Sequence, residues 1–443
     1  MERAIIIFTR VPLAGKTKTR MMPALTPMEC EQLHISFLKD IKQECEKVST
    51  DIFVAFTPED KEKKLVKILG DDKIYFSQKG NDFGEKMYNA IKFVLDKNYK
   101  SCVLIGTDIP EIKKEYLENA FKGLNNKDIV FGPTKDGGYY LVGMNKPIEE
   151  AFKNQIYGKG TVLENTVFRL KNKNFKIEYV KELSDIDTID DLRKFRNRIR
   201  ENRKEQKTES SKFVYSNNKV SIIIPIYNEE STIEYIQKQL YTFKDKCEII
   251  FVDGGSSDNT LNLIDSNFTV INSEKGRANQ MNLGAEKSTG DTLFFLHSDS
   301  KLPSDFLMQI KEVMKKYRVG CFGIIFDSKN FFMFACRIIS NFRAKYRRII
   351  FGDQGIFIDR DLFFELGMYP NLPIMEDYQF SLSLRDKGFK VGITKDRINT
   401  SDRRYPKKTI QKLKLMWKMY KLRKMYRNGV DINILSNNYK DIR

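Results

Sequence analysis

The chain begins the same kind of fold twice. Two apolar, β-branched runs, residues 4–8 and 220–225, start 216 residues apart, and helical periodicity and further apolar runs follow each of them. The further runs cover residues 51–56, 101–106 and 128–132 in the first half and 248–252 and 292–296 in the second. Strands that alternate with helices at this spacing predict an α/β fold with a mostly parallel sheet in each half. Because such sheets bind ligands at the carboxyl ends of their strands, we expect the functional side chains just after these runs.

The net charge of +18 is concentrated in two segments. Residues 193–212 hold nine Lys or Arg against three acids, and residues 403–427 hold eleven Lys or Arg and no acid. The rest of the chain is nearly neutral, which argues against a nucleic-acid-binding surface and predicts no nucleic-acid partner. The predicted domains are an α/β domain over 1–198, a basic linker over 199–218, a second α/β domain over 219–402 and a basic helical tail over 403–443.

The composition favours a cytoplasmic protein. No stretch has the roughly 18 to 20 uninterrupted apolar residues that a spanning helix needs, and the first apolar run is too short for a signal peptide. The six cysteines have no Cys-x-x-Cys spacing, which favours a reducing compartment. Only His34 and His297 are present, and neither is near a cysteine pair, so no structural zinc site is expected.

Five polar segments of the second half each follow a predicted strand or open a predicted helix. They are residues 225–230, 253–260, 276–284, 297–300 and 375–378. Taken singly, Asp258 and Thr260 are typical turn or cap residues, and Glu376 and Asp377 suit a helix N-terminus. Capping alone explains five such segments in this order much less readily, so together they indicate a binding site.

This ordered set resembles the family-2 glycosyltransferases of the GT-A fold. The sequences Gly-Arg-Ala at 276–278, Leu-His-Ser-Asp at 296–299 and Gly-Asp-Gln-Gly at 352–355 resemble one branch, the radical-SAM/selenodomain-associated transferase 2 group, often labelled arsenosugar-biosynthesis glycosyltransferases. The resemblance implies a nucleotide-binding, Rossmann-like α/β sheet. It also implies inverting transfer of a sugar from a nucleoside diphosphate to an acceptor.

The resemblance assigns metal and nucleotide roles to these segments. A diphosphate leaving group develops charge that Mg²⁺ or Mn²⁺ would neutralise, and Asp299 is the expected carboxylate ligand. The usual Asp-x-Asp motif is replaced by His297-x-Asp299, and His297 is expected either to contact ribose or phosphate or to be an ordinary strand-end residue. The predicted nucleotide-binding residues are Pro225, Tyr227, Glu229, Asp253 and Arg277, with a surface arginine as the alternative for the last.

The resemblance also predicts catalytic and acceptor-side residues. Inverting displacement needs a general base, which we expect in the pair Glu376 and Asp377, with Asp377 favoured. Gly352–Gly355 is expected to be an acceptor-side loop or a plain tight turn. Residues on the acceptor or phosphate side are His297, Asp353, Gln354, Arg403 and Arg404, and ordinary surface charge is the alternative for the two arginines.

In the first half, a basic loop follows the first strand. It contains Gly15, Lys16, Lys18 and Arg20 within one expected strand-to-helix turn, where backbone N–H groups and a helix dipole favour anions. The spacing is not that of a P-loop. We therefore predict phosphate binding here, with a solvated basic loop as the alternative.

Four more segments accompany this loop, at residues 82–87, 106–110, 132–140 and 185–192. Together they resemble the radical-SAM/selenodomain-associated transferase 1 group, whose wider relatives include the molybdenum-cofactor and phospholactate guanylyltransferases. The resemblance implies that Asp108 and Asp187 hold a divalent cation, with Lys16, Lys18 and Arg20 on the phosphates. Asp136 and Gly137 are expected on the acceptor or phosphate side, although a turn would also explain the glycine. Thr188 and Asp191 could instead cap a helix.

Two nucleotide-type sites on one chain suggest a bifunctional enzyme. The first domain would attach a nucleotide from an NTP to a sugar phosphate, and the second would transfer the activated sugar to an acceptor. In the alternatives, both domains are glycosyltransferases acting in sequence, or the chain is a catalytically degenerate nucleotide- or nucleic-acid-binding protein.

The tail carries two apolar stripes between its basic residues. Leu413, Met416, Trp417 and Tyr420 form one, and Leu415, Met419, Leu422 and Tyr426 form the other. One stripe is expected to pack on the domain. The other is expected to contact an anionic membrane surface or a partner subunit. In the alternative, the whole helix packs on its own domain and presents a charged outer face.

Overall fold

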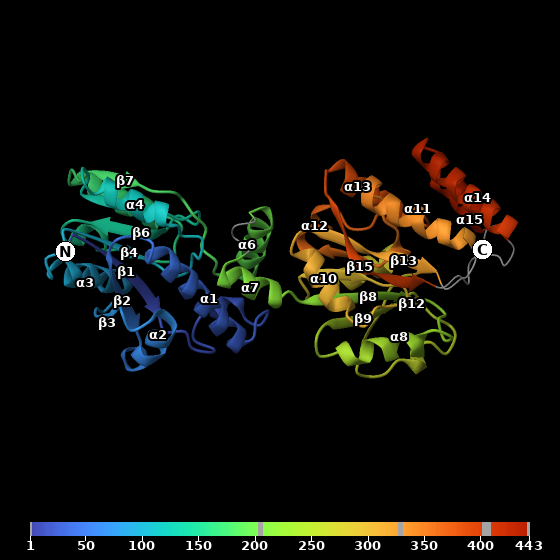
Figure 1. Cartoon of the computed structure of the whole chain (residues 1–443), viewed down its shortest axis with the longest axis horizontal. Coiled ribbons are helices and arrows are strands. Elements are labelled where there is room, and N and C mark those ends of the chain that lie inside the picture. Colours follow the sequence, from blue (N-terminus) through green and yellow to red (C-terminus); the bar gives the residue numbers. More distant parts are fainter. Residues whose placement is uncertain (1, 203–206, 327–330, 401–408, 441–443) are drawn as a thin grey trace. The chain divides into compact units, whose positions relative to one another are not determined.

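The computed structural model describes residues 2–202, 207–326, 331–400 and 409–440. The chain divides into two compact bodies, Met1–Ser216 and Asn217–Arg443 (Figure 1). Each body contains one mixed α/β sheet, which confirms the predicted fold class. In the described ranges, no helix combines the length and apolar character needed to cross a membrane.

The first body is built on a seven-stranded sheet of order β3-β2-β1-β4-β6-β5-β7. Its strands are β1 (Arg3–Arg10), β2 (Asp51–Thr57), β3 (Ile74–Ser77), β4 (Ser101–Ile105), β5 (Ile129–Pro133), β6 (Tyr139–Met144) and β7 (Ile177–Tyr179). Only β6 runs antiparallel to its neighbours among these pairs.

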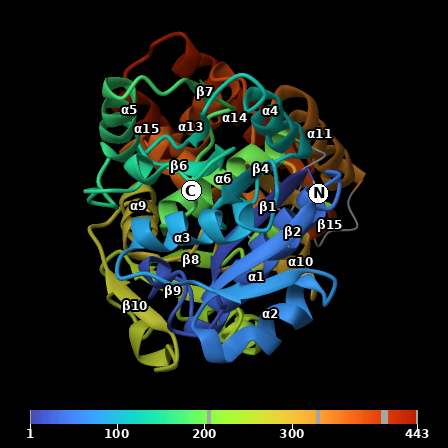
Figure 2. The same cartoon turned by 90° about the vertical axis from the view of Figure 1, so that its left-hand side faces the viewer.

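Helices cover both faces of this sheet, as Figures 1 and 2 show. Ile5 and Ile7 of β1 pack in one apolar cluster, while Ala4 and Ile6 pack in the cluster on the opposite face. Both faces are buried, which explains the continuous apolar run. The helices are α1 (Pro27–Cys45), α2 (Glu62–Leu69), α3 (Phe83–Leu95), α4 (Lys114–Gly123), α5 (Val162–Asn172), α6 (Ile189–Glu201) and α7 (Glu209–Ser216).

The range 199–218, predicted as an exposed linker, contains helix α7. Asp40 of α1 accepts hydrogen bonds from the backbone N–H groups of Glu209 and Ser210, at 2.7 and 2.8 Å. Val214 and Tyr215 are buried in a cluster with residues of α1 and α6. The local charge suggested exposure, but a cap and apolar contacts distant in sequence hold this segment on the first body.

The second body has an eight-stranded sheet of order β10-β9-β8-β11-β14-β13-β15-β12. Its strands are β8 (Val220–Ile226), β9 (Glu248–Asp253), β10 (Thr269–Asn272), β11 (Thr292–Phe295), β12 (Ser300–Lys301), β13 (Val319–Phe326), β14 (Ile356–Asp359) and β15 (Val391–Thr400). Strand β14 is antiparallel to both β11 and β13. Strands β10, β9, β8 and β11 run parallel to one another, so their carboxyl ends lie at the same edge of the sheet.

The helices of the second body also pack on two faces. Ile222 and Ile224 of β8 join one apolar cluster, and Ile223 joins the other. The helices are α8 (Ile233–Leu240), α9 (Arg277–Lys287), α10 (Phe306–Met314), α11 (Phe331–Arg347), α12 (Arg360–Glu365), α13 (Glu376–Asp386), α14 (Thr409–Arg427) and α15 (Ile432–Lys440). The last two form most of the predicted helical tail.

Candidate active site

The loops after β8 and β9 form one connected polar edge in the second body. The Asn228 N–H donates to Ser256 Oγ at 2.9 Å, and the Glu229 N–H donates to Thr260 Oγ1 at 2.7 Å. The Asn228 carboxamide oxygen accepts from the Ser257 N–H at 2.8 Å. These hydrogen bonds fix the two loops against each other at the carboxyl end of the sheet.

Asp253, at the end of β9, organises its own turn. The residue is 2% exposed, and its carboxylate accepts hydrogen bonds from the N–H groups of Gly255 and Ser256, at 2.9 and 3.0 Å. Asp253 thus stabilises the turn that follows β9.

The other predicted nucleotide-binding residues line the same edge. Tyr227 is 39% exposed, and Lys275 Nζ donates to its hydroxyl at 2.9 Å. Pro225 is half-buried and pairs with Val252 across β8 and β9. The Glu229 carboxylate accepts from Thr232 Oγ1 at 2.7 Å.

Gln280 on α9 ties these strand ends to a helix, and the sequence did not single it out. Its amide Nε2 donates to the carbonyls of Ile226 and Val252, both at 2.7 Å. A Cβ on Gly254 would lie 3.0 Å from the Gln280 amide carbon, so a larger residue there would crowd this contact. Gln280 thus positions the first turn of α9 and Arg277 at its start.

Arg277 and Glu376 face each other across this edge. The Arg277 guanidinium lies 3.4 Å from Glu376 Oε1, and the two side chains are 32% and 7% exposed. Burial and the neighbouring Asp377 raise the pKa of Glu376 to about 7, although Arg277 opposes this rise. Arg277 thus packs against an acid, which favours the site interpretation over a solvated surface arginine.

Helix α13 begins abruptly at Glu376, because Met375 takes a left-handed conformation with φ 67°. This turn places Asp377 toward the loop at 352–354. Asp377 Oδ2 accepts a hydrogen bond from the Gly352 N–H at 2.9 Å. A Cβ on Gly352 would lie 2.7 Å from His297 Nε2 and 3.7 Å from Asp377 Oδ2. Gly352 therefore brings His297 and Asp377, far apart in sequence, together.

Gln354 has a structural place that its sequence position did not reveal. It is fully buried, and its amide oxygen accepts from Arg343 at 3.3 Å while its nitrogen donates to the Phe322 carbonyl at 3.5 Å. An acceptor-side role for its side chain does not fit this position, because core groups already use the amide. Asp353 stays half-buried in the same turn.

Asp299 lies between β11 and β12 and is half-buried. The next residue, Ser300, pairs with Thr400 of β15, and Thr400 Oγ1 donates to the Asp353 carbonyl at 3.0 Å. Asp299 is thereby held near the loop that carries Asp353. Arg403 and Arg404 lie outside the described residues.

The donor set around Asp299 suits a cation shared with a substrate. In the described ranges, no three His, Cys, Asp or Glu side chains converge as a metal site. Mg²⁺ is commonly held by one or two carboxylates together with substrate phosphates, and one carboxylate at a strand end fits that pattern. It does not fit a preformed protein cage.

In the first body, Lys18 joins the two predicted metal ligands. Its ammonium forms ion pairs with Asp108 and with Asp187, the latter at 3.2 Å, and donates to the Ile186 carbonyl at 2.6 Å. The Lys18 side chain is only 4% exposed. Burial opposes ionisation of Asp108, but Lys18 together with His34 and Arg10 outweighs it, and the pKa of Asp108 is lowered. An internal cation therefore already pairs with both carboxylates, which do not fit a preformed metal site.

The basic loop itself differs from the predicted strand-to-helix turn. Gly15 and Lys18 have φ of 73° and 52°, a left-handed conformation that an α-helix excludes. A short 3₁₀ turn follows at Thr19–Met21, and α1 begins only at Pro27. No α-helix N-terminus lies at this loop in the described structure. Lys16 is exposed, and Arg20 lies 3.4 Å from Asp187.

A second acidic pair lies beside this cluster. Burial and the neighbouring Asp136 raise the pKa of Asp185 to about 6. Gly137, with φ 86°, would place a Cβ only 1.8 Å from the Gly160 carbonyl oxygen. Close approach of two backbone segments therefore explains this glycine. Thr188 and Asp191 form the capping box of α6, so the 185–192 segment both caps a helix and presents Asp187 to Lys18.

His34 lies beside this cluster against Thr9 and Thr107, whereas the sequence raised it only as a zinc ligand and excluded that role. It is 4% exposed, and its Nε2 lies 3.3 Å from the hydroxyls of Thr9 and Thr107. Burial lowers the pKa of His34 to about 4, so the imidazole is neutral near pH 7. A hydrophobic helix face was the only sequence signal for it.

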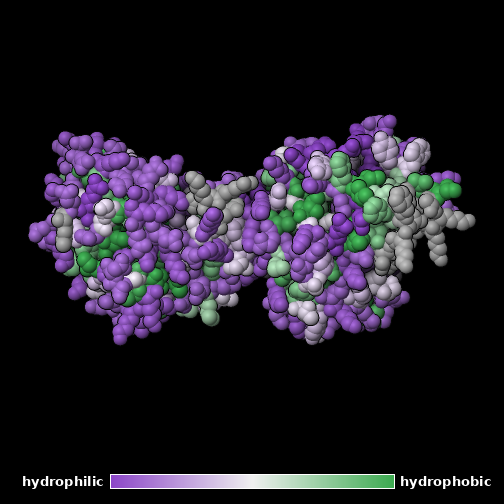
Figure 3. Space-filling view, viewed as in Figure 1, coloured by the Kyte–Doolittle hydropathy of each residue, from purple (hydrophilic) through white to green (hydrophobic). Residues whose placement is uncertain are grey.

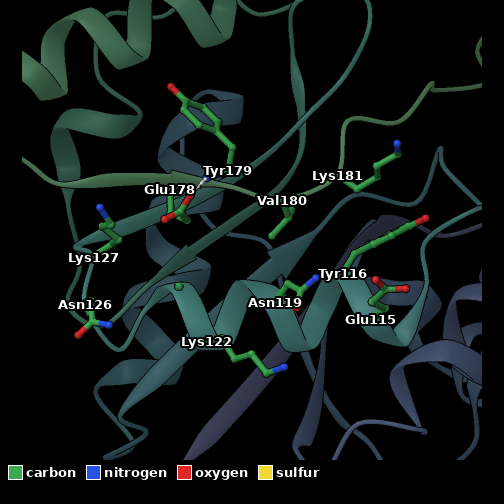
Figure 4. A pocket seen from close by; sticks show the side chains of 11 residues that line it. Glu115, Tyr116, Asn119, Lys122, Asn126, Lys127, Glu178, Tyr179, Val180 and Lys181 are labelled. Carbon is green, nitrogen blue, oxygen red and sulfur yellow. Dashed lines mark hydrogen bonds between the residues drawn. The ribbon is translucent and has the colours of Figure 1, made fainter.

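A surface hollow of about 570 Å³ lies elsewhere in the first body. Figure 4 shows it between α4 and the edge strand β7, with Lys122 and Tyr179 pointing away from each other. None of its lining residues is among the predicted site residues, so the hollow does not bear on the site.

Comparisons with known proteins also divide the chain into two parts. Residues 41–159 match the family described as "Uncharacterized protein conserved in bacteria (DUF2064)", and residues 221–370 match the family described as "Glycosyl transferase family 2". The chain joins a DUF2064 domain to a family-2 glycosyltransferase domain. The DUF2064 match contains Asp108 and Asp136 but neither Lys18 nor Asp187, and the family-2 match ends before Glu376. Lys18, Asp187 and Glu376 are therefore placed in these sites by their contacts alone.

Individual relatives cover parts of the chain. It is 29% identical over 139 residues to 2-phospho-L-lactate guanylyltransferase of Methanocaldococcus vulcanius, which is 31% of this chain and 60% of that protein. It is 32% identical over 94 residues to poly-β-1,6-N-acetyl-D-glucosamine synthase of Staphylococcus aureus, 19% of this chain and 23% of that protein. The chain thus spans less than two thirds of both relatives. A solved structure from Desulfovibrio desulfuricans, assigned as a nucleotide-diphospho-sugar transferase, is 27% identical with a TM-score of 0.47, over 49% of this chain and 96% of that one.

Proposed function

We propose that the family-2 domain transfers a sugar from a nucleoside-diphosphate donor to an acceptor hydroxyl, with inversion at the anomeric carbon. The observation that carries this proposal is the convergence of Glu376 and Asp377 with Arg277 and Gly352 at the carboxyl end of the sheet. These contacts bring two carboxyl groups and a guanidinium together in the body that contains the glycosyltransferase family match. The acceptor itself stays unassigned.

The donor would lie along the loops after β8 and β9. Tyr227, Glu229 and Asp253 would meet the base and ribose, because these loops are fixed to one another at the strand ends. Arg277, at the start of α9, would meet the diphosphate, where its charge and fork geometry suit phosphate oxygens. His297, held beside Gly352, would lie between the donor and Asp377.

The reaction balances as a single displacement. The acceptor oxygen bonds to the anomeric carbon while the bond from that carbon to the diphosphate oxygen breaks, and the diphosphate leaves with the electron pair. Asp377 takes the proton of the acceptor hydroxyl, because it is less buried than Glu376 and adjoins the 352–354 loop. Glu376 positions Arg277. When bound, Mg²⁺ or Mn²⁺ would neutralise the leaving diphosphate, and Asp299 is the residue that would hold it.

Substitutions at three aspartates test this proposal in the full chain. Release of nucleoside diphosphate from a panel of nucleotide sugars with Mn²⁺ measures turnover, and thermal shift measures donor binding. Asp377→Asn should lower turnover by about 10² to 10⁴-fold with donor binding retained, whereas Asp299→Asn should weaken Mn²⁺-dependent donor binding. Asp386→Asn, at the other end of α13 and 65% exposed, is the control. Wild-type turnover in Asp377→Asn would exclude this base.

For the DUF2064 domain, we propose nucleotidyl transfer from an NTP to a sugar phosphate. The phosphate oxygen of the sugar would attack the α-phosphorus of the NTP, and pyrophosphate would leave. The support is the cluster of Lys18, Asp108 and Asp187 at the strand ends, together with the guanylyltransferase relative. The product would be a donor for the second domain. In the alternative, both domains are glycosyltransferases.

Pyrophosphate release by the full chain separates these two possibilities. Release with an NTP and a sugar phosphate, lost in Lys18→Met but retained in Lys61→Met, supports nucleotidyl transfer. Lys61 is 48% exposed and is the matched control. No pyrophosphate across a broad panel, with nucleotide-sugar turnover intact in Asp377→Asn, would instead favour two glycosyltransferases.

A further inference from the structure

Two helices of the second body expose large apolar side chains. The residues of α11 and α14 concerned are Phe334 (46% exposed), Ile338 (51%), Ile339 (56%), Phe342 (52%), Tyr346 (62%), Ile410 (69%), Leu413 (50%), Trp417 (67%) and Tyr420 (54%). On α11 most recur every four residues, and on α14 they recur at alternating spacings of three and four. Each set therefore forms one stripe along its helix. Figure 3 shows hydrophobic side chains gathered over these helices.

The opposite sides of these helices are packed, so the stripes are not an undocked tail. Leu422 of α14 is buried against Tyr378 of α13, and the Tyr426 hydroxyl donates to Gln379 at 2.8 Å. Cys336 of α11 and Met416 of α14 lie 3.1 Å apart through their sulfur atoms. As predicted, one apolar stripe of the tail packs on the second body and the other is exposed. Met416 is the exception, because it was grouped with the exposed stripe but contacts Cys336 on the packed side.

Positive charge surrounds the exposed stripes. Residues 331–350 hold four Arg and one Lys with no Asp or Glu, and residues 409–427 hold seven Lys or Arg with no acid. Lys345, Arg347, Lys414, Lys421 and Lys424 are exposed. A second copy of this surface would bring like charges together, which disfavours self-association. An amphipathic surface of aromatic, aliphatic and basic residues matches an anionic lipid bilayer.

We propose that α11 and α14 form a membrane-docking surface that binds anionic lipid headgroups, with Trp417 and its apolar neighbours entering the interface. The surface is connected to the candidate site. Arg343 of α11 and Arg423 of α14 lie over the Phe351 ring, at 4.1 and 5.7 Å from its centre. Phe351 precedes the loop whose Gly352 N–H bonds to Asp377. Docking would therefore hold the acceptor side of the site near the bilayer, a consequence that rests on the proposed function.

Trp417 is the single tryptophan of the chain, so intrinsic fluorescence reports on this surface directly. The full chain is titrated with vesicles of phosphatidylcholine alone and of phosphatidylcholine with phosphatidylglycerol, and bound protein is measured by sedimentation. A blue shift of Trp417 emission and co-sedimentation with the anionic vesicles only are expected. No shift and no sedimentation with anionic vesicles would overturn the proposal.

Two sets of variants separate this surface from general charge attraction. Lys414→Glu with Lys421→Glu should weaken anionic-vesicle binding by at least about 30-fold, since each basic residue near the surface contributes roughly fivefold. Lys238→Glu with Lys287→Glu, exposed on α8 and α9, makes the same change in net charge and should weaken it far less. Ile338→Ser with Leu413→Ser should reduce binding at unchanged charge. Circular dichroism checks that each variant is folded.

Three other results would identify a different occupant and overturn the proposal. Equal weakening by both pairs of charge variants would mean unspecific attraction. Trp417 emission that shifts with protein concentration in the absence of vesicles would identify a second copy. Duplex DNA that shifts Trp417 emission, while anionic vesicles do not, would identify a nucleic acid. Each of these leaves the turnover tests of Asp377 and Asp299 unaffected.

Discussion

Replacing Glu376 by glutamine is expected to stabilise the second body in alkali and to have little effect in acid. The Glu376 side chain is only 7% exposed, and burial together with Asp377 raises its pKa from 4.5 to about 7. Between these pH values the native state keeps a proton that the unfolded chain has lost. The unfolding free energy of the wild type therefore falls as the pH rises through this range. Glutamine stays neutral and removes that loss.

The size of the effect follows from the pKa. A rise from 4.5 to about 7 corresponds to about 3 kcal/mol, at about 1.4 kcal/mol per pKa unit. Nearly all of this cost is present at about pH 8, and about 1 kcal/mol is present at about pH 5. The attraction of Arg277 is already contained in the pKa. Because Arg277 is 32% exposed, water can solvate its guanidinium after the substitution.

Hydrogen exchange measured by mass spectrometry isolates the second body, whose β8 and β11 amides lie in the core of its sheet. Glu376→Gln should slow their exchange roughly 200-fold at about pH 8 and roughly fourfold at about pH 5, where exchange reports global unfolding. Glu365→Gln is the control, because Glu365 also lies 3.4 Å from an arginine but is 53% exposed. It should alter exchange by less than about fivefold. Equal effects of Glu376→Gln at the two pH values, or faster exchange in alkali, would refute the reasoning.

Three further substitutions have expected outcomes. Burial lowers the pKa of His34 from 6.5 to about 4. As the pH falls through this range, the unfolded state therefore binds the proton before the native state does. The unfolding free energy of the wild-type first body should fall by about 3 kcal/mol. Urea unfolding of His34→Gln should lack this loss, and an identical pH dependence would contradict it. Gln280→Leu leaves the buried carbonyls of Ile226 and Val252 without their donor. It should lower the unfolding free energy, measured by urea unfolding, by about 2 kcal/mol. Gln239→Leu is the control, because the Gln239 amide is half-exposed. Lys18→Met removes the ammonium between Asp108 and Asp187 and should tighten Mn²⁺ binding about tenfold in electron paramagnetic resonance titrations, whereas Lys16→Met should not.

The fold could be predicted from sequence where burial is continuous along a strand. Residues 4–8 and 220–225 read as buried strands because helices cover both faces of β1 and β8. Helix α7 could not be predicted, because its cap is Asp40, about 170 positions earlier in the chain. The delayed start of α1 was hidden for a different reason. The left-handed φ of Lys18 is unusual for a non-glycine residue, and no local pattern signals it.

The site could be predicted as a set of segments but not as a set of contacts. Arg277 was expected at the donor and Glu376 in the general-base pair, and their side chains lie together. Gln354 was predicted on the acceptor side, yet its amide is already bonded to Arg343 and to the Phe322 carbonyl in the core. Gly137 was expected near a ligand, yet the Gly160 backbone fills that space. Motif spacing places residues at a strand end, whereas only tertiary packing decides which side chains remain available.

Both bodies set an internal cation against two carboxylates, and the pKa shifts differ because the other neighbouring charges differ. Burial opposes ionisation of Asp108, but Lys18 and the neighbouring His34 and Arg10 together outweigh it and lower its pKa. Glu376 is 7% exposed beside Arg277, and there burial and Asp377 prevail and raise its pKa to about 7. Asp108 therefore stays ionised beside Lys18 at neutral pH. The second body contains a carboxyl that exchanges its proton near neutral pH. A general base works best under such conditions, which supports the proposal that the Glu376–Asp377 pair takes the proton of the acceptor hydroxyl.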